Sequence, residues 1–275
     1  MNIYKQPIDR TAKKVGLFCN ARDETNIREW VAHHLLIGFD CIVLFDHKSR
    51  IPLQQVFHNF DNRVSVIRAE LPDGNIKQLL MNKAIDIAKK MNLDWFIYLD
   101  ADEFLILNKM FKGVKHLLNT YSYGDLLAVN WVMFGTNYLT TAPDGLILEN
   151  YTRSRERLDH HVKTFVRPYQ AIKSDNPHYY HIKNKSKMLG IDFKIMKPQY
   201  CYHHSDIPFY NAPAYIAHYV YQSEETYLKR KINMLGDDGI MRSNLGKEIH
   251  NQFNDGINTQ PQKYVRQIKE FLKCH

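Results

Sequence analysis

Along the first 105 residues, short apolar runs alternate with longer segments in which apolar residues recur at the spacing of a helix. Short, mostly apolar runs predict strands at 15–19, 41–45, 64–69 and 95–99. Between them, apolar residues recur every three or four positions, which predicts helices over 24–37, 53–60 and 77–91. Strands that alternate with helices in this order predict an α/β fold with a mostly parallel, Rossmann-like central sheet flanked by helices.

The pattern becomes less regular after the fourth strand. Two more strands are expected at 126–134 and 162–166, and two helices at 224–235 and 262–272. The segments between them are rich in Pro, Gly, Asn, His and Tyr, which is typical of long binding loops. Because the change near residue 120 has neither a repeat nor a linker, we expect one domain over residues 1–275.

The fourth apolar run ends abruptly in acids at Asp100, Asp102 and Glu103. In an extended segment Asp100 and Asp102 point the same way, so they present hard oxygen ligands for a divalent cation that can in turn hold a diphosphate. Polar residues also follow the other three runs, at 20–24, 46–49 and 73–74. Parallel strands bring these ends to one edge, which predicts a binding crevice there. The alternative is that they are helix caps and turn formers.

Charge and composition narrow the classes of partner. The chain carries a net charge of +8 and has a pI near 9.1, which suits nucleic acid, an anionic membrane or a small polyanion. Basic residues are dispersed, with local clusters at 183–187 and 229–231 and no interleaved stacking aromatics, so no nucleic-acid partner is expected. The chain has no long apolar span, no secretory signal and no C-x-x-C pair, which favours a reduced, cytoplasmic protein.

Other motifs for phosphate chemistry are missing. Phe104 stands where an Asp-x-Asp phosphatase needs Thr or Val, and Gly246-Lys247 is followed by Glu248 instead of the Ser or Thr of a P-loop. The sequence contains no G-x-G-x-x-G after the first strand and no G-x-S-x-G elbow.

A series of blocks in chain order resembles the glycosyltransferases of GT-A fold, in the branch related to families 2 and 92. Glu103-Phe104 completes the characteristic LDADEF block, and Arg22 and Gln222 depart from the family pattern. The matching blocks lie at 20–24, 29–40, 43–49, 78–82, 96–105, 130–136, 162–168 and 218–225.

The resemblance implies a metal-dependent, inverting transferase that moves a sugar from a nucleoside diphosphate sugar to a hydroxyl of a glycan or glycoconjugate. The bound Mn²⁺ or Mg²⁺ would neutralise the leaving diphosphate. Its implied ligands are Asp102 directly, Asp100 directly or through water, and His218. The first 120 residues would form the nucleotide-sugar half and residues 121–275 the acceptor half. A nucleotide-binding module without turnover and a sugar nucleotidyltransferase remain as alternatives, although the latter normally has a glycine-rich loop after the first strand.

The resemblance also assigns roles to further residues. Asp46 is expected to accept a hydrogen bond from a uracil N–H, which favours a UDP-sugar. The other expected donor-binding residues are Asn20, Arg22, Glu24, Asp73, Gln78, Asp100, Lys163 and Arg167. The candidate bases are Glu149, whose apolar context favours a raised pKa, and Asp144; Glu103 is expected to orient the loop or the acceptor side. Trp131, Phe134 and Tyr138 are candidate stacking surfaces for an acceptor sugar.

The C-terminal helix has an apolar stripe beside basic residues. Val265, Ile268, Phe271 and Leu272 recur at helical spacing. Such a helix either packs on the domain, which we favour, or makes a peripheral contact with an anionic membrane.

Overall fold

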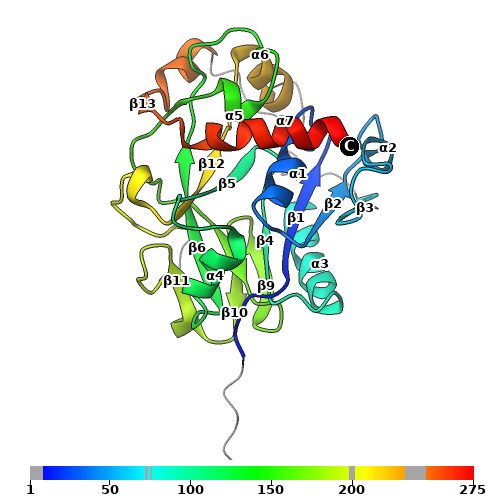
Figure 1. The fold of residues 1–275 in the computed structure, drawn as a ribbon, viewed down its shortest axis with the longest axis vertical. Helices are drawn as coiled ribbons and strands as arrows, with labels where there is room; N and C mark the ends of the chain where they lie inside the picture. The colour runs from blue at the N-terminus through cyan, green and yellow to red at the C-terminus, as the bar shows by residue number, and fades with distance from the viewer. Residues whose placement is uncertain (1–8, 72–73, 75, 198–201, 233–245) are drawn as a thin grey trace, which may run out of the picture.

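The computed structural model describes residues 9–71, 74, 76–197, 202–232 and 246–275. It is an α/β structure with a large, curled, mostly parallel central sheet flanked by helices, which confirms the predicted fold class (Figure 1). The elements of the first half are β1 (Val15–Ala21), α1 (Ile27–Leu36), β2 (Cys41–Asp46), α2 (Leu53–Val56), β3 (Val64–Arg68), α3 (Ile76–Lys90), β4 (Trp95–Tyr98), β5 (Glu103–Leu107) and α4 (Val114–Thr120).

The second half contributes further strands to the same sheet. Its elements are β6 (Leu126–Met133), α5 (Ile147–Asn150), β7 (Arg153–Ser154), β8 (Val162–Val166), β9 (Ala171–Asn176), β10 (Tyr179–Ile182), β11 (Met188–Gly190), β12 (Ala214–His218), α6 (Glu224–Tyr227), β13 (Gly256–Ile257) and α7 (Val265–Cys274). All the strands predicted from apolar runs are present. The strands β5, β7 and β9–β13 and the helices α4 and α5 were not predicted, apart from the fold class that contains them.

Within the described residues, nine strands form the central sheet, in the order β3-β2-β1-β4-β8-β6-β12-β5, with β11 beside β6. The first four positions are mutually parallel, so the carboxyl ends of β1 to β4 meet at one edge as predicted. Strand β8 runs antiparallel between β4 and β6. One apolar cluster packs α1, α4 and α7 on one face of the sheet, and a second packs α3 and the β9–β10 hairpin on the other.

The curl of the sheet follows from the short link between β4 and β5. Only residues 99–102 join the two strands, yet β5 stands four positions away in the strand order. Four strand spacings of about 4.8 Å would need roughly 19 Å, whereas five residue steps reach at most about 18 Å. The turn is tighter still, because Glu103 N donates to Asp100 O at 3.0 Å. The sheet must therefore bend so that β5 begins beside the end of β4.

Helix α1 supplies side-chain hydrogen bonds along the open edge of β5. Strand β5 pairs with β12 on one side, and on the other Trp30 Nε1 donates to Glu103 O at 2.7 Å. His33 Nε2 lies 2.9 Å from Leu105 O, and Leu105 N donates to His34 Nε2 at 3.3 Å. These three contacts satisfy backbone groups that a further strand would otherwise pair.

His34 must be neutral to make its bonds, whereas His33 acts only as a donor to Leu105 O. His34 Nδ1 lies 2.8 Å from Trp30 O, so Nδ1 carries the hydrogen and Nε2 is left as the acceptor for Leu105. Burial lowers the pKa of His33 to about 4 and that of His34 well below its usual range. The unfolded chain therefore binds more protons below about pH 6.5, and this contribution to stability is lost as the pH falls from there through the folded-state values.

We expect His34→Ala to lower the free energy of unfolding by about 2–4 kcal/mol, because it removes the acceptor for a buried N–H and opens a cavity. Urea denaturation at pH 7.5 measures this. His58→Ala, at an exposed position, is the matched control and should stay within about 0.5 kcal/mol of the parent. Equal losses in the two variants would contradict the role given to His34.

Candidate functional site

The acidic turn lies where the carboxyl ends of the parallel strands meet. Residues 99–102 follow β4 directly, and Tyr219 N donates to Asp102 O at 2.9 Å, which ties the turn to the end of β12. Trp30 on α1 also donates to Glu103 O, so the backbone carbonyls of Asp102 and Glu103 are both held. The three acids are thus presented from a rigid frame.

Asp100 faces two lysines. Its Oδ1 lies 2.7 Å from Lys77 Nζ on α3, and its Oδ2 lies 3.3 Å from Lys163 Nζ on β8. Burial opposes ionisation, but Lys163 and Lys77 together hold the pKa of Asp100 well below its usual range. Lys163 is almost fully buried and also donates to Pro177 O at 3.1 Å. Asp100 is therefore a carboxylate with its charge already compensated.

Asp102 divides its two oxygens between different partners. Oδ1 lies 3.7 Å from His218 Nε2, at the end of β12. Oδ2 lies 3.2 Å from Lys231 Nζ and 3.4 Å from Arg230 Nη2. Arg230 also contacts Glu24 at 3.0 Å, so it bridges the loop after β1 and the acidic turn. Although Asp102 is buried, Lys231 and Arg230 keep its pKa below the usual range.

Glu103 is fully buried inside the turn. Its Oε2 accepts from Asp100 N at 2.9 Å and lies 3.5 Å from Lys163 Nζ. Burial raises its pKa to about 8, and the lowering effect of Lys163 only partly offsets this. At neutral pH the side chain is therefore mainly protonated. The geometry makes Glu103 a positioning residue of the turn, as expected.

The predicted metal ligands come together only in part. Asp100, Asp102 and His218 do not place three ligand atoms within 4.8 Å of one another, because Asp100 turns toward Lys77 and Lys163. Asp102 Oδ1 and His218 Nε2 do face one another. Burial lowers the pKa of His218 to about 4, so its imidazole is neutral at pH 7, as a metal ligand must be. This pair fits a divalent cation that takes its other ligands from phosphate oxygens and water.

Two adjoining hollows flank the loop after β1. One, of about 420 Å³, is lined by Arg22, Lys229 and Arg230, among others, and reaches Asp102 through the Arg230 side chain. The other, of about 450 Å³, is lined by Glu24 and the start of α1. They share a wall at Asp23, Thr25 and Arg50. The structure therefore places Arg22 and Glu24 on two adjoining cavities, the first of which is bounded by Arg230, the ion-pair partner of Asp102.

Other predicted donor-binding residues lie near this edge in different settings. Asn20 is buried and accepts from the Tyr98 hydroxyl at 3.1 Å. Gln78 is half-buried on α3, next to Lys77 in the chain. Asp73 lies outside the described residues.

Asp46 differs from the expectation. Its oxygens accept from Ser49 N at 3.1 Å, from Leu53 N at 3.0 Å and from Arg68 Nη1 at 2.8 Å, and the side chain is fully buried. The carboxylate therefore holds the loop after β2 and the start of α2. Because these donors occupy both oxygens, the expected bond to a uracil N–H, and the preference for uridine drawn from it, are not supported.

Arg167 was wrongly placed at the site by sequence reasoning. Its guanidinium lies 4.4 Å from the Trp95 ring centre, at the amino end of β4, and donates to the backbone of Arg10, Ser122 and Gly124. This is the opposite end of the strand from Asp100. The arginine therefore ties the N-terminal segment to the sheet.

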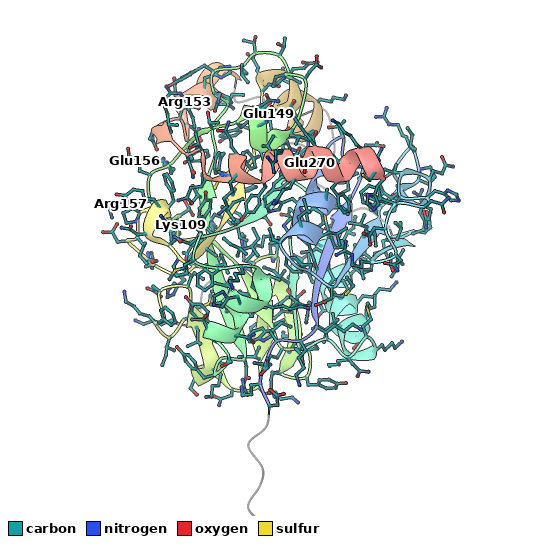
Figure 2. The ribbon with its side chains drawn as sticks, viewed as in Figure 1. Lys109, Glu149, Arg153, Glu156, Arg157 and Glu270 are labelled. Atoms are coloured by element: carbon teal, nitrogen blue, oxygen red, sulfur yellow. The ribbon has the colours of Figure 1, made fainter. Side chains whose placement is uncertain are left out.

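The two candidate bases from the second half also lie apart from the acidic turn. Glu149 is on α5 beside α7, where Lys269 Nζ approaches it to 2.6 Å (Figure 2). Asp144 is exposed in the preceding loop. Among the described residues, neither carboxylate contacts Asp100, Asp102 or Glu103. The apolar residues next to Glu149 in the sequence, Ile147 and Leu148, lie on the buried side of α5, so they do not surround its carboxylate.

Among the aromatic candidates, Phe134 reaches the site through its backbone N, which donates to His218 O at 3.0 Å, whereas Trp131 contacts the site through its ring. Its ring centre lies 4.3 Å from that of His218, and its Nε1 is buried with no hydrogen-bond partner among the described residues. Phe134 is fully buried in the core, whereas Tyr138 is exposed.

Sequence reasoning missed three cations of the site: Lys77, Arg230 and Lys231. The basic cluster at 229–231 was visible, but no local pattern shows that it folds onto Asp102, more than 100 residues away. Lys77 was missed because it lies in a helix that was predicted from the spacing of its apolar residues alone.

The C-terminal helix packs on the domain. Ile268 is fully buried, and Val265, Phe271 and Leu272 pack against the same core as α1 (Figure 1). The apolar stripe therefore faces the core, as we favoured from the sequence. Within the described chain, no helix combines the length and apolarity needed to cross a bilayer.

Comparisons with known proteins leave the family open. No family model and no curated protein matches the chain. Among solved structures, it is similar to HddC from Yersinia pseudotuberculosis (TM-score 0.39, 13% identity, covering 78% of this chain and 96% of that one). It is also similar to a cytidylyltransferase from Leptospira borgpetersenii serovar Hardjo-bovis (TM-score 0.31, 16% identity, 57% of this chain and 61% of that one). A third is CMP:2-keto-3-deoxy-manno-octonic acid synthetase with CTP (TM-score 0.31, 10% identity, 59% and 80%).

With TM-scores of 0.31 to 0.39, these likenesses assign no activity to the chain. The resemblance to glycosyltransferases in the sequence therefore stays a prediction.

The raised pKa of Glu103 has a measurable consequence for stability. The folded chain holds a proton that the unfolded chain releases near pH 4.5, so this contribution is complete below that pH and is lost as the pH rises through about 8. Glu103→Gln keeps a neutral side chain at every pH. Its free energy of unfolding, from urea denaturation between pH 5 and 8.5, should therefore fall less steeply with pH than that of the parent. Identical pH slopes would contradict a protonated Glu103.

Proposed function

We propose that this protein is a metal-dependent glycosyltransferase that moves a sugar from a nucleoside diphosphate sugar to a hydroxyl of a glycan or glycoconjugate. The observation that carries the proposal is the setting of Asp102. This buried carboxylate lies at the carboxyl edge of the parallel strands, with one oxygen toward neutral His218 and the other toward Arg230 and Lys231. Such a residue can hold a cation on one side while cations on the other side meet the ligand's anionic groups.

The balance of charge supports an anionic ligand. The acids Glu24, Asp100 and Asp102 face four cations, while Glu103 is mainly neutral at pH 7. The cations are Lys77, Lys163, Arg230 and Lys231. The enclosed site therefore carries an excess of positive charge before any ligand enters, which attracts a polyanion such as a diphosphate.

Asp102 and His218 would hold the Mn²⁺ or Mg²⁺, with Asp100 close by in the same turn. When bound, the cation would neutralise charge that develops on the departing diphosphate. Arg230 and Lys231 would shift from Asp102 to the phosphate oxygens as the donor enters. Arg22 and Glu24 would line the nucleotide side, next to the loop that Asp23 fixes through Arg50 N at 2.9 Å.

The acceptor would approach from the side of Trp131, on β6. Its buried Nε1 is a free donor in the described structure, and its ring lies against His218, so a sugar hydroxyl there would be close to Asp102. The reaction would break the bond from the sugar's anomeric carbon to the diphosphate oxygen. It would form a bond from that carbon to the acceptor oxygen, whose proton passes to a base.

A sugar nucleotidyltransferase is the second candidate, because the same four cations fit a nucleoside triphosphate. Solved structures similar to this chain include a cytidylyltransferase and a CMP:2-keto-3-deoxy-manno-octonic acid synthetase, although at TM-scores too low to decide the matter. Against it, residues 20–26 after β1 contain no glycine. Their loop is shaped by Asp23 at a φ of 54° and by its bonds to Arg50.

The released product separates the two candidates. The protein is incubated with Mn²⁺ and a panel of UDP-, GDP- and dTDP-sugars, and free nucleoside diphosphate is measured with water as acceptor. In parallel, nucleoside triphosphates are supplied with sugar 1-phosphates, and pyrophosphate is measured. We expect nucleoside diphosphate release that needs the metal and is lost in Asp102→Asn. Pyrophosphate release alone would replace the proposal with the second candidate, and binding without either product would favour a binding module.

We also expect Lys231→Ala to weaken binding of the nucleoside diphosphate released in that assay about tenfold to a hundredfold. The reason is that a charge-assisted contact to phosphate contributes about 1.5–3 kcal/mol. Isothermal titration calorimetry with Mn²⁺ present measures this. Lys183→Ala removes the same charge from an exposed position outside the site and serves as the control. Equal affinities for the two variants would remove Lys231 from the phosphate site.

A further inference from the structure

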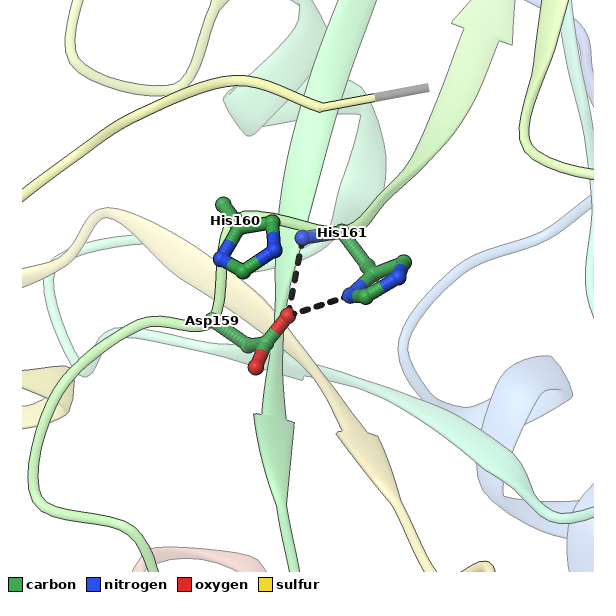
Figure 3. A group of neighbouring side chains, drawn as sticks. All are labelled: Asp159, His160 and His161. Atoms are coloured by element: carbon green, nitrogen blue, oxygen red, sulfur yellow. Dashed lines mark hydrogen bonds and ion pairs between the residues drawn. The ribbon is translucent and has the colours of Figure 1, made fainter. Parts of the chain in front are cut away.

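A second group of metal-ligand side chains lies outside the acidic turn. Asp159, His160 and His161 stand in the loop that leads into β8, and one ligand atom from each lies within 4.8 Å of the others (Figure 3). In the part of the chain that the structure describes, this is the one group of three or more such residues that meets that distance.

Asp159 orients the ring of His161. Its Oδ1 accepts from His161 Nδ1 at 2.6 Å and from His161 N at 2.9 Å (Figure 3). A carboxylate bonded to one ring nitrogen sets the tautomer of an imidazole, which leaves the other nitrogen, Nε2, with its lone pair for a metal.

The backbone of this loop is held from two sides. Asp159 N donates to Trp131 O at 2.7 Å, and Trp131 N donates to His161 O at 2.9 Å. Asn130 Nδ2, also on β6, donates to Asp159 O at 2.9 Å, and His203 N from another segment donates to His160 O at 2.8 Å. The ligand side chains thus project from a fixed frame, as a preorganised metal site requires.

A further histidine, His204, lies beside this group. The rings of His160 and His204 are 5.5 Å apart and nearly parallel, and both residues are exposed. Within the described part of the chain neither side chain makes a hydrogen bond, so small rotations can bring their nitrogens toward a common ion. In a tetrahedral site with bonds of about 2.0–2.1 Å, ligand atoms lie roughly 3.3 Å apart, so His160 has to move inward by a modest distance.

We propose that His160, His161 and His204 bind a divalent transition ion of the Zn²⁺ type, with Asp159 orienting His161 and water completing the ligand set. Imidazole nitrogens favour Zn²⁺ or Co²⁺ over the hard ions Mg²⁺ and Mn²⁺. This site is separate from Asp102, and the proposal does not depend on the proposed transferase activity. The ion would also steady Trp131, whose ring is stacked 5.0 Å from that of His161.

Titration of the untagged full chain with Zn²⁺ and with Co²⁺ tests the site. Calorimetry gives the number and affinity of the ions, and the visible absorption of Co²⁺ reports nitrogen ligation. We expect one tight ion per chain, with affinity reduced at least tenfold in both His160→Ala and His161→Ala. Asp159→Asn should weaken binding about 10- to 100-fold, as loss of an orienting carboxylate does.

Two controls separate this site from other binding. His58→Ala removes an exposed histidine elsewhere and should leave the affinity unchanged. Asp102→Asn should also retain the tight ion, since its carboxylate belongs to the other site. Circular dichroism confirms that each variant is folded. Zn²⁺ affinity that is the same in the parent, His160→Ala and His161→Ala would overturn the proposal, as would a tight ion lost only in Asp102→Asn.

Discussion

The hydrogen bonds from α1 to the edge of β5 are the constraint on which the site depends. Strand β5 begins immediately after the acidic turn and has a strand partner on one side only. Trp30, His33 and His34 take the place of a neighbouring strand on the other side. Because α1 is also packed against the core of the sheet, the turn is held between a helix and a strand. This explains why two histidines are kept neutral inside an apolar cluster.

The second constraint is the compensation of buried charge. Asp100 and Asp102 remain ionised in a buried setting because lysines and an arginine from three distant segments converge on them. A buried carboxylate with less compensation takes up a proton instead, as Glu103 does although Lys163 lies 3.5 Å away. The same cations that stabilise the acids are placed to meet an anionic ligand. Folding and binding thus use one set of contacts.

Much of the fold was predictable because the first half follows a strong alternation of strand and helix. The convergence of β1 to β4 at one edge follows from that order. Strand β5 was not predicted, because its apolar residues follow the acidic turn directly, with no polar segment between them to mark a new element. Site residues were predictable where they follow a strand end, as with Asp102. They were not predictable where the role depends on tertiary contact: Asp46 is occupied by its own loop, Arg167 lies at the opposite end of β4, and Arg230 arrives from the far end of the chain.

The central claim is that Asp102 and His218 hold a divalent cation to which a nucleoside diphosphate binds. The most direct test is a crystal grown with Mn²⁺ and the nucleoside diphosphate that the protein releases from its sugar donor. Diffraction is measured near the manganese absorption edge. The account predicts an anomalous peak within bonding distance of Asp102 Oδ1 and His218 Nε2, with diphosphate density against Lys231 and Arg230. Diphosphate bound elsewhere, or bound here with Arg230 and Lys231 still on Asp102 and no anomalous peak, would contradict it.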